Sequence, residues 1–332
     1  MKRTFSILAV SAAFLLWAAV LVMIYDRGQN NKALIYAEIP PSTIEFITNL
    51  SDGLNDILIS FNPDPDVDDW DNDNDPGINS KTGLKNIQDA YFIIYYPEKL
   101  EVDAREILYM ANKAIPHLKS VCGRYFYPDD VNGRKLPIYL SDDYDEFIRQ
   151  YELIRGPVED KDKYKNTSGL YLSVTSLMGC VTEGILLNGD FVVKHFDKHA
   201  KSTLWHEMTH YVFFTSLDYS RSEMQIPMWC YEGIAEYCGH EAERPVFNDK
   251  EIAEMRNTCD LRDMNFEYVY QNYSGGRSIY CYMEDEYNAE AITSFLETLY
   301  HSGVDSSLME NFSIDIDDLE EDWKENLDSF KR

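Results

Sequence analysis

Basic residues are scarce in this sequence. Its 332 residues include 30 lysines and arginines against 58 aspartates and glutamates, which gives a formal net charge of −28. A surface this acidic repels phosphate groups and anionic lipid headgroups. We therefore expect no nucleic-acid partner and no docking on an anionic membrane through a basic face. Internal repeats are also missing, and the 45% apolar content is enough for one large core or two smaller ones.

Cysteines are few. The six lie at positions 122, 180, 230, 238, 259 and 281. An even number permits disulfides in an oxidising compartment, and free buried thiols are the alternative in a chain of this length. One pairing is excluded if residues 228–238 are helical. Cys230 and Cys238 would then lie about 12 Å apart, whereas a disulfide spans at most roughly 7 Å between Cα atoms.

Charged residues are missing altogether from residues 5–25, which follow Lys2 and Arg3. About 20 apolar residues are enough for a helix to cross the hydrocarbon core of a membrane. A cleaved signal peptide usually has a shorter apolar run that ends in a small-x-small cleavage site, and this run ends in VMIYDRG. We therefore expect an uncleaved transmembrane anchor at 1–27, with a cleaved signal peptide as the alternative.

The orientation of this anchor is only weakly marked by charge. Arg27 and Lys32 follow the apolar run, so they balance Lys2 and Arg3 on the other side. We predict that the short tail lies inside and the acidic remainder outside the cytoplasm, at the cell surface. Cleavage of the segment would make the protein secreted instead.

Residues 28–83 are expected to connect the anchor to the main domain. Ser42 and Glu45 have the spacing of a capping box. The apolar residues that follow recur on one helical face, which predicts a juxtamembrane amphipathic helix. These residues are Ile44, Ile47, Leu50, Leu54, Ile57 and Leu58.

An aspartate-rich stretch follows this helix. Asp71, Asp73 and Asp75 alternate as the ligands of calcium loops do. However, Pro76 stands at the sixth position, where such loops have glycine, and Thr82 at the twelfth, where they have glutamate. A solvated acidic linker is the preferred interpretation, and a Ca2+ site is the alternative.

Residues 84–332 have the patterns of a folded domain. Short apolar runs typical of strands and amphipathic runs typical of helices alternate up to about residue 197. We expect strands at 90–97, 135–141, 168–174 and 184–189, and helices at 102–126 and 143–153. The remainder is mainly helical, so the sequence predicts one α+β domain.

Two of the seven histidines belong to an H-E-x-x-H motif, formed by His206, Glu207 and His210. Residues four apart share one face of a helix, so both imidazoles can bind a single metal ion. Glu207 lies beside that face, within reach of a water molecule at the metal. Zinc is the expected ion, because two imidazoles and one carboxylate leave a fourth position open. Two structural histidines are the alternative for so short a motif.

A second segment supplies acidic side chains. Residues 227–239, PMWCYEGIAEYCG, begin with proline and end with glycine, as short helices often do. Glu232 and Glu236 lie four apart on this segment, which is otherwise mostly apolar. Carboxylates directed inward need a partner. A cation bound to His206 and His210 would be such a partner.

The sequence H-E-M-T-H, followed later by W-C-Y-E-G-I-A-E-Y, resembles the gluzincin zinc metallopeptidases. The likeness is strongest to thermolysin-like and aminopeptidase-like catalytic domains and to the peptidase MA-like group. This resemblance implies a zincin-like domain with a small mixed sheet. It also implies that Glu232 is the third metal ligand and that Glu236 supports a ligand histidine.

The resemblance extends over about residues 88–330. The segments before the expected metal-binding helix occur in the order that these enzymes use. By this order, the strand at 184–189 is similar to the edge strand along which peptide substrates add in these enzymes. The stretch NYSGGRSIY resembles the Y-x-x-G element that supplies a tyrosine to the transition state, which implies this role for Tyr273. Tyr270 and Tyr280 are near enough to compete for it, and a packing role for Tyr273 is the other alternative.

Three more histidines, His195, His199 and His240, flank the two segments. Each could contact the substrate or support a metal ligand, but surface or packing roles are favoured. We expect His117 to be structural and Trp323 to lie in the core.

The expected function is hydrolysis of peptide bonds in a peptide or protein substrate, outside the cytoplasm. The resemblance implies a zinc-activated water with Glu207 as its general base, and an oxyanion stabilised by zinc and Tyr273. The alternative is a metal-binding or protein-binding domain on the same scaffold that hydrolyses nothing. Glu207 counts against this alternative, because a non-catalytic zinc site does not need it. No motif for a free amine is evident, so exopeptidase and endopeptidase action both stay open.

Overall fold

The described part of the chain belongs to a single unit, Asp73–Arg332. The computed structural model describes residues 83–123, 135–175, 181–217, 226–262 and 271–332. The expected anchor at 1–27, the amphipathic helix and the aspartates Asp71, Asp73 and Asp75 lie outside these ranges. Among the helices within them, none has the length and apolar character needed to span a membrane.

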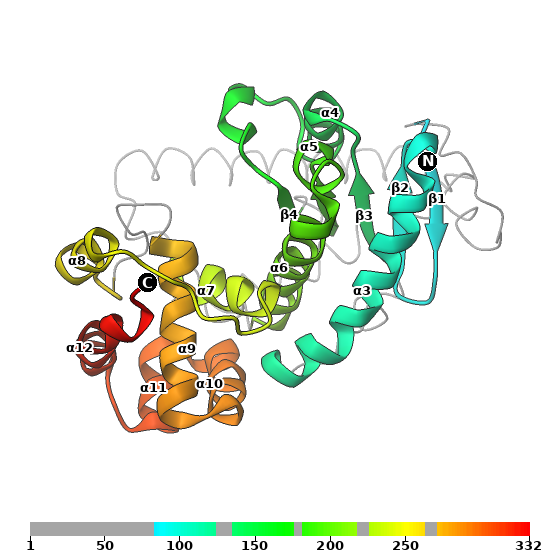
Figure 1. Cartoon of the computed structure of the whole chain (residues 1–332). Helices are drawn as coiled ribbons and strands as arrows, with labels where there is room; N and C mark the ends of the chain where they lie inside the picture. Colours follow the sequence, from blue (N-terminus) through cyan, green and yellow to red (C-terminus); the bar gives the residue numbers. More distant parts are fainter. Residues whose placement is uncertain (1–82, 124–134, 176–180, 218–225, 263–270) are drawn as a thin grey trace, which may run out of the picture. The chain divides into compact units, whose positions relative to one another are not determined.

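A five-stranded mixed sheet forms the first part of the fold (Figure 1). Its strands lie in the order β1-β2-β3-β5-β4. The three central strands run parallel, and the two edge strands are antiparallel to their neighbours. The strands are β1 Lys85–Gln88, β2 Phe92–Tyr96, β3 Leu136–Leu140, β4 Gly169–Thr175 and β5 Val181–Leu187. The coarse prediction of an α+β fold with a small mixed sheet is confirmed.

The prediction of the edge strand is wrong. The segment at 184–189 begins within β5, which lies between β3 and β4, so β4 forms the edge. Ile185, Leu186 and Leu187 are each fully buried. Consecutive buried apolar residues are typical of a strand that is covered on both faces. An edge strand such as β4 instead mixes apolar with small and polar residues.

The two faces of the sheet are covered by different helices. Helices α3, Glu101–Cys122, and α6, Phe196–Ser216, pack on one face, and α4, Tyr144–Arg155, packs on the other. Ile185 and Leu187 join the core under α3 and α6, whereas Leu186 joins a smaller cluster with Phe147 of α4. This split follows from the alternation of side chains along a strand.

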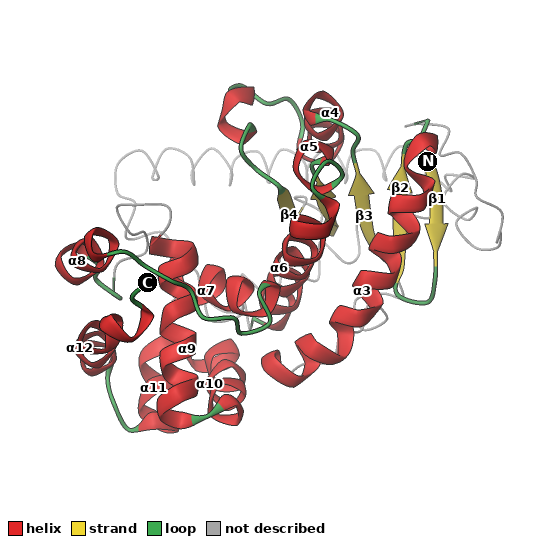
Figure 2. Ribbon diagram, in the orientation of Figure 1, coloured by secondary structure: helices red, strands yellow, loops and turns green. Residues whose placement is uncertain are grey.

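The rest of the described chain is mainly helical (Figure 2). Helix α7 packs against α6 on one side and α9 on another. As predicted, Trp323 of α12 is fully buried, and its indole N–H donates to Ser278 Oγ at 3.0 Å. The helices are α5 Gly189–Val192, α7 Met228–Gly239, α8 Asp249–Thr258, α9 Gly276–Tyr287, α10 Ala289–Ser302, α11 Val304–Phe312 and α12 Ile316–Asn326.

Several helices begin at residues that the sequence marks as caps. The Asp143 carboxylate accepts a bond from the Glu146 N–H at the start of α4. Asn248 and Glu251 form a reciprocal capping box at the start of α8. Such caps satisfy amide groups that have no partner within the helix. Local sequence therefore fixes where these helices start.

The described cysteines are not joined by disulfides. Cys122, Cys230, Cys238, Cys259 and Cys281 are all free and buried. Cys180 lies outside the described residues. For these five residues, the alternative of free buried thiols is the one that the structure shows.

Candidate metal centre

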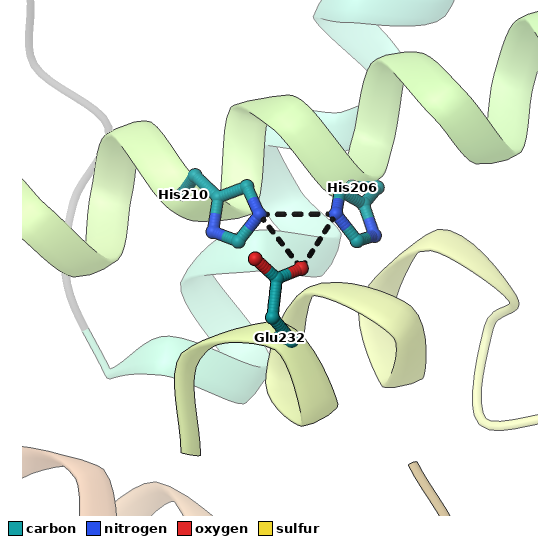
Figure 3. A group of neighbouring side chains, drawn as sticks. All are labelled: His206, His210 and Glu232. Carbon is teal, nitrogen blue, oxygen red and sulfur yellow. Dashed lines mark hydrogen bonds and ion pairs between the residues drawn. The ribbon is translucent and has the colours of Figure 1, made fainter. Parts of the chain in front are cut away.

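Two helices bring the expected metal ligands together (Figure 3). His206 and His210 lie on successive turns of α6 and face α7, which carries Glu232. The Nε2 atoms of the two histidines are 3.0 Å apart. Glu232 Oε2 lies 3.3 Å from His206 Nε2 and 3.4 Å from His210 Nε2.

Glycine lets the end of α7 approach α6 closely. A Cβ atom at Gly239 would lie 2.7 Å from the Ser202 carbonyl oxygen and 3.3 Å from His206 Cβ. Side chains cannot occupy such a space, so helices meet closely where glycine stands. The glycine that the sequence marks as a helix end therefore also sets the spacing of α6 and α7, the helices that carry the expected ligands.

The three side chains fit the donor set of a zinc ion. Atoms that bind zinc at about 2.0–2.2 Å in a tetrahedron lie roughly 3.3–3.6 Å from one another, close to the spacing of these three. Among the described residues, buried Glu232 Oε2 accepts no well-aligned hydrogen bond and has the two imidazole nitrogens within ion-pair distance, an arrangement that a cation between the three atoms would satisfy. Within the part of the chain that the structure describes, no other cluster of histidine, cysteine and acidic side chains has ligand spacing.

The charges of the centre favour a cation. Burial alone would raise the pKa of Glu232, but the adjacent imidazoles of His206 and His210 outweigh it and lower the pKa to about 2. Burial lowers the pKa of His206, yet Glu232 and Glu236 outweigh that effect and raise it above its usual value. The same carboxylates that attract a proton to His206 attract a divalent cation.

Glu236 lies behind the first histidine. Its Oε1 is 3.1 Å from His206 Nδ1, so the Nδ1 proton is held there and Nε2 is left to face Glu232. Burial by itself would raise the pKa of Glu236. The contacts with His206 and His240 outweigh this effect, so the net pKa is lowered and the carboxylate is charged. This is the position that the resemblance implies for a residue that supports a ligand histidine.

Glu207 contacts the edge strand of the sheet. Its Oε2 accepts a hydrogen bond from the Tyr171 backbone N–H of β4 at 2.6 Å. A Cβ atom at Gly169 would lie 2.5 Å from Thr203 Cγ2 and 3.0 Å from Glu207 Cγ, so glycine is required for β4 to reach α6. Burial raises the pKa of Glu207, which brings it closer to the range of an effective base at neutral pH.

Tyr273 is the tyrosine beside the centre. It lies in a single π-helical turn, Gln271–Gly275, and its ring is stacked 5.9 Å from the His206 ring. Its pKa is raised by burial and by nearby carboxylates, so the phenol stays protonated and can donate. Tyr280 instead is fully buried and donates to the Cys230 carbonyl oxygen at 2.9 Å, while Tyr270 lies outside the described residues.

The remaining histidines occupy different surroundings. His195 is the N-cap residue of α6, and His199 is exposed one turn later. His117 stacks on Trp205 at 5.0 Å, in line with the structural role expected for it. His240 is half-exposed, and its Nε2 lies 3.3 Å from Glu236 Oε2, a contact that the sequence interpretation did not single out.

Aromatic residues beside His210 were also missed. The Phe214 ring lies 5.9 Å from the His210 ring and is stacked on Tyr171 of β4 at 6.2 Å. Tyr231 lies 6.1 Å from His210 and 5.4 Å from Phe214. The signal was present, because Phe214 follows His210 by four residues and Tyr231 directly precedes Glu232.

No protein family matches the chain, and no curated protein matches it.

Proposed function

We propose that this protein is a zinc-dependent metallopeptidase with a gluzincin-like catalytic domain at 84–332. The observation that carries the proposal is the convergence of His206, His210 and Glu232, with Glu207 next to them on α6. Two imidazoles and a carboxylate are the protein ligands of a hydrolytic zinc site. A buried glutamate beside the ligands is the feature that a purely structural zinc site does not need.

Each residue of the centre would then have its own role in peptide hydrolysis. Zinc, when bound, polarises the scissile carbonyl and acidifies water. His206, His210 and Glu232 hold the ion, and Glu207 accepts the proton from the attacking water and passes it to the leaving amine. The Tyr273 hydroxyl donates to the developing oxyanion.

Among the described strands, β4 lies at the edge of the sheet, and this position supports a peptide as the substrate. The outward N–H of Tyr171 already reaches Glu207, so the outer edge of β4 runs past the proposed general base. A peptide that adds to this edge as a further strand would place its backbone beside the metal ligands. Phe214 and Tyr231 lie on the His210 side of this path and would contact its side chains.

The proposed setting of the protein rests on the sequence alone. The apolar run at 5–25 favours a membrane anchor, with the catalytic domain outside the cytoplasm at the cell surface. The acidic surface is compatible with this setting and unfavourable for nucleic acid.

Metal analysis of the purified protein and a cleavage profile on a mixed peptide library test the function. We expect one zinc ion per chain, and cleavage that is lost with a strong chelator and restored by zinc. A protein that carries zinc but cleaves no peptide in the library would contradict the proposed activity. A protein that binds no zinc would contradict the site itself.

A further inference from the structure

Within the described part of the chain, a carboxylate lies at the Nδ1 atom of only one of the two proposed ligand histidines. His206 Nδ1 lies 3.1 Å from Glu236 Oε1. His210 Nδ1, in contrast, is buried and has no hydrogen-bond partner among the residues that the structure describes. The orientation of the imidazoles at the proposed centre therefore depends on how firmly Glu236 itself is held.

The second oxygen of Glu236 shows what holds it. Glu236 Oε2 lies 3.3 Å from His240 Nε2, so the carboxylate bridges a buried imidazole and a half-exposed one. The side chain of Glu236 is 17% exposed and that of His240 is 37% exposed. The contacts thus form a line from the protein surface through His240 and Glu236 to His206.

The backbone fixes His240 in this position. His240 follows Glu236 by four residues, and its backbone N–H donates to the Glu236 carbonyl oxygen at 3.0 Å. This bond closes the last turn of α7 and stacks the two side chains on one face of the helix. Little conformational freedom is then lost when the imidazole binds the carboxylate.

We propose that His240 is a positioning residue for the metal centre. It holds the Glu236 carboxylate in the rotamer that binds His206 Nδ1, and thereby keeps His206 Nε2 directed at the metal position. The inference rests on the proposed metal centre and adds to it a residue that touches neither the metal nor the substrate. Residues that support a ligand from behind tune metal affinity because they fix its orientation and tautomer.

The zinc affinity of the full-length protein tests this role, measured by competition with a chromogenic chelator. His240→Ala should weaken zinc binding about threefold to tenfold, the range expected for one hydrogen bond. His240→Gln should restore most of this loss, because its amide can still donate to Glu236. His199→Ala, an exposed histidine on the metal-binding helix, should leave the affinity unchanged.

A double-mutant cycle with Glu236→Ala tests whether His240 changes the zinc affinity through Glu236. In that background His240→Ala should cost no further affinity, because His240 acts only through the carboxylate. An equal loss in both backgrounds, or a parent-like affinity of His240→Ala, would overturn the proposal. A parent protein that binds zinc but hydrolyses nothing would refute the peptidase function and leave this test intact. A parent that binds no zinc would overturn both.

Discussion

Glu207 and Glu232 are both buried carboxylates, but their different partners give them different tasks. Glu232 lies between two imidazoles and is held in its charged form. Glu207 accepts a backbone N–H from Tyr171, and burial raises its pKa. At the scale of single residues, the first is suited to bind a cation and the second to exchange a proton.

Replacing Glu207 with glutamine separates these tasks. Glu207→Gln keeps the shape of the side chain but removes its basicity, so we expect peptide hydrolysis to fall by at least about a hundredfold. The zinc content should stay near that of the parent, because the ligands are intact. Parallel metal analysis and peptide-cleavage assays measure the two quantities, and hydrolysis at the parent rate would exclude Glu207 as the base.

Replacing the two glutamates of α7 distinguishes the ligand from its support. We expect Glu232→Ala to lose stoichiometric zinc, because a donor atom disappears. Glu236→Ala should retain zinc with an affinity lowered about 10- to 100-fold, as is typical of residues that support a ligand. Equilibrium dialysis against zinc measures both variants, and the reverse order would make Glu236 the third ligand.

At the scale of helices, the centre depends on two close contacts of α7. Gly239 allows the approach to α6, and Gly233 meets Gly276 of α9. Gly233 directly follows Glu232, and Gly276 follows Tyr273 by three residues. The spacing of α7 and α9 thus sets how far Tyr273 lies from the ligand cluster.

Adding one methyl group tests this contact. The Cβ atom of a Gly233→Ala variant would lie 2.7 Å from the Gly276 backbone, which cannot move aside as a flexible side chain would. We expect the free energy of unfolding to fall by about 1–3 kcal/mol, although alanine has a better helix propensity than glycine. Denaturant titration measures the change. Ser306→Ala, at an exposed position of α11, should stay within about 0.5 kcal/mol of the parent.

Elements with strong local signals were predictable from the sequence, and those fixed by distant contacts were not. Helix α7 was expected at 227–239 and is observed at Met228–Gly239, because proline and glycine mark its ends. The strand β1 was missed, since KNIQ has a single apolar residue and forms by pairing with β2. For β5 the two signals disagree: its apolar run is typical of an interior strand, the resemblance implies an edge strand, and the structure places it in the interior.

At the candidate site, too, local spacing was predictable from the sequence and contacts between distant segments were not. The spacing of His206 and His210 within one helix, and of Glu232 and Glu236 within another, could be identified from the sequence. The bond from Tyr171 to Glu207 could not, because a backbone N–H carries no sequence signal. The contact of His240 with Glu236 has the i, i+4 spacing of a helical pair, but many such pairs on helices have no role at a site.

At the scale of the whole domain, the sheet and the helices share one main core. It includes residues from Phe92 of β2 to Phe330 near the C-terminus. The proposed metal ligands lie at the junction of α6 and α7 inside this unit. An ion bound there therefore stabilises the folded domain as a whole rather than one loop.

Thermal unfolding with and without zinc measures this effect. Binding to the folded state alone adds about 4 kcal/mol of stability when free zinc exceeds its dissociation constant a thousandfold. We expect the melting temperature of the parent to rise by several degrees with zinc and that of Glu232→Ala to stay unchanged. Glu310→Ala, an exposed position on α11, should respond as the parent does. A parent without any zinc-dependent shift would argue against the centre.

The division of the proposed ligands between two helices would also set the order in which the site assembles. His206 and His210 come into register as soon as α6 is helical, whereas Glu232 arrives only when α7 docks on it. A nascent chain would thus hold a zinc ion loosely with two imidazoles, and tightly only after the helices have packed. Slow exchange of zinc would then mark the mature domain, and rapid exchange would mark a folding intermediate.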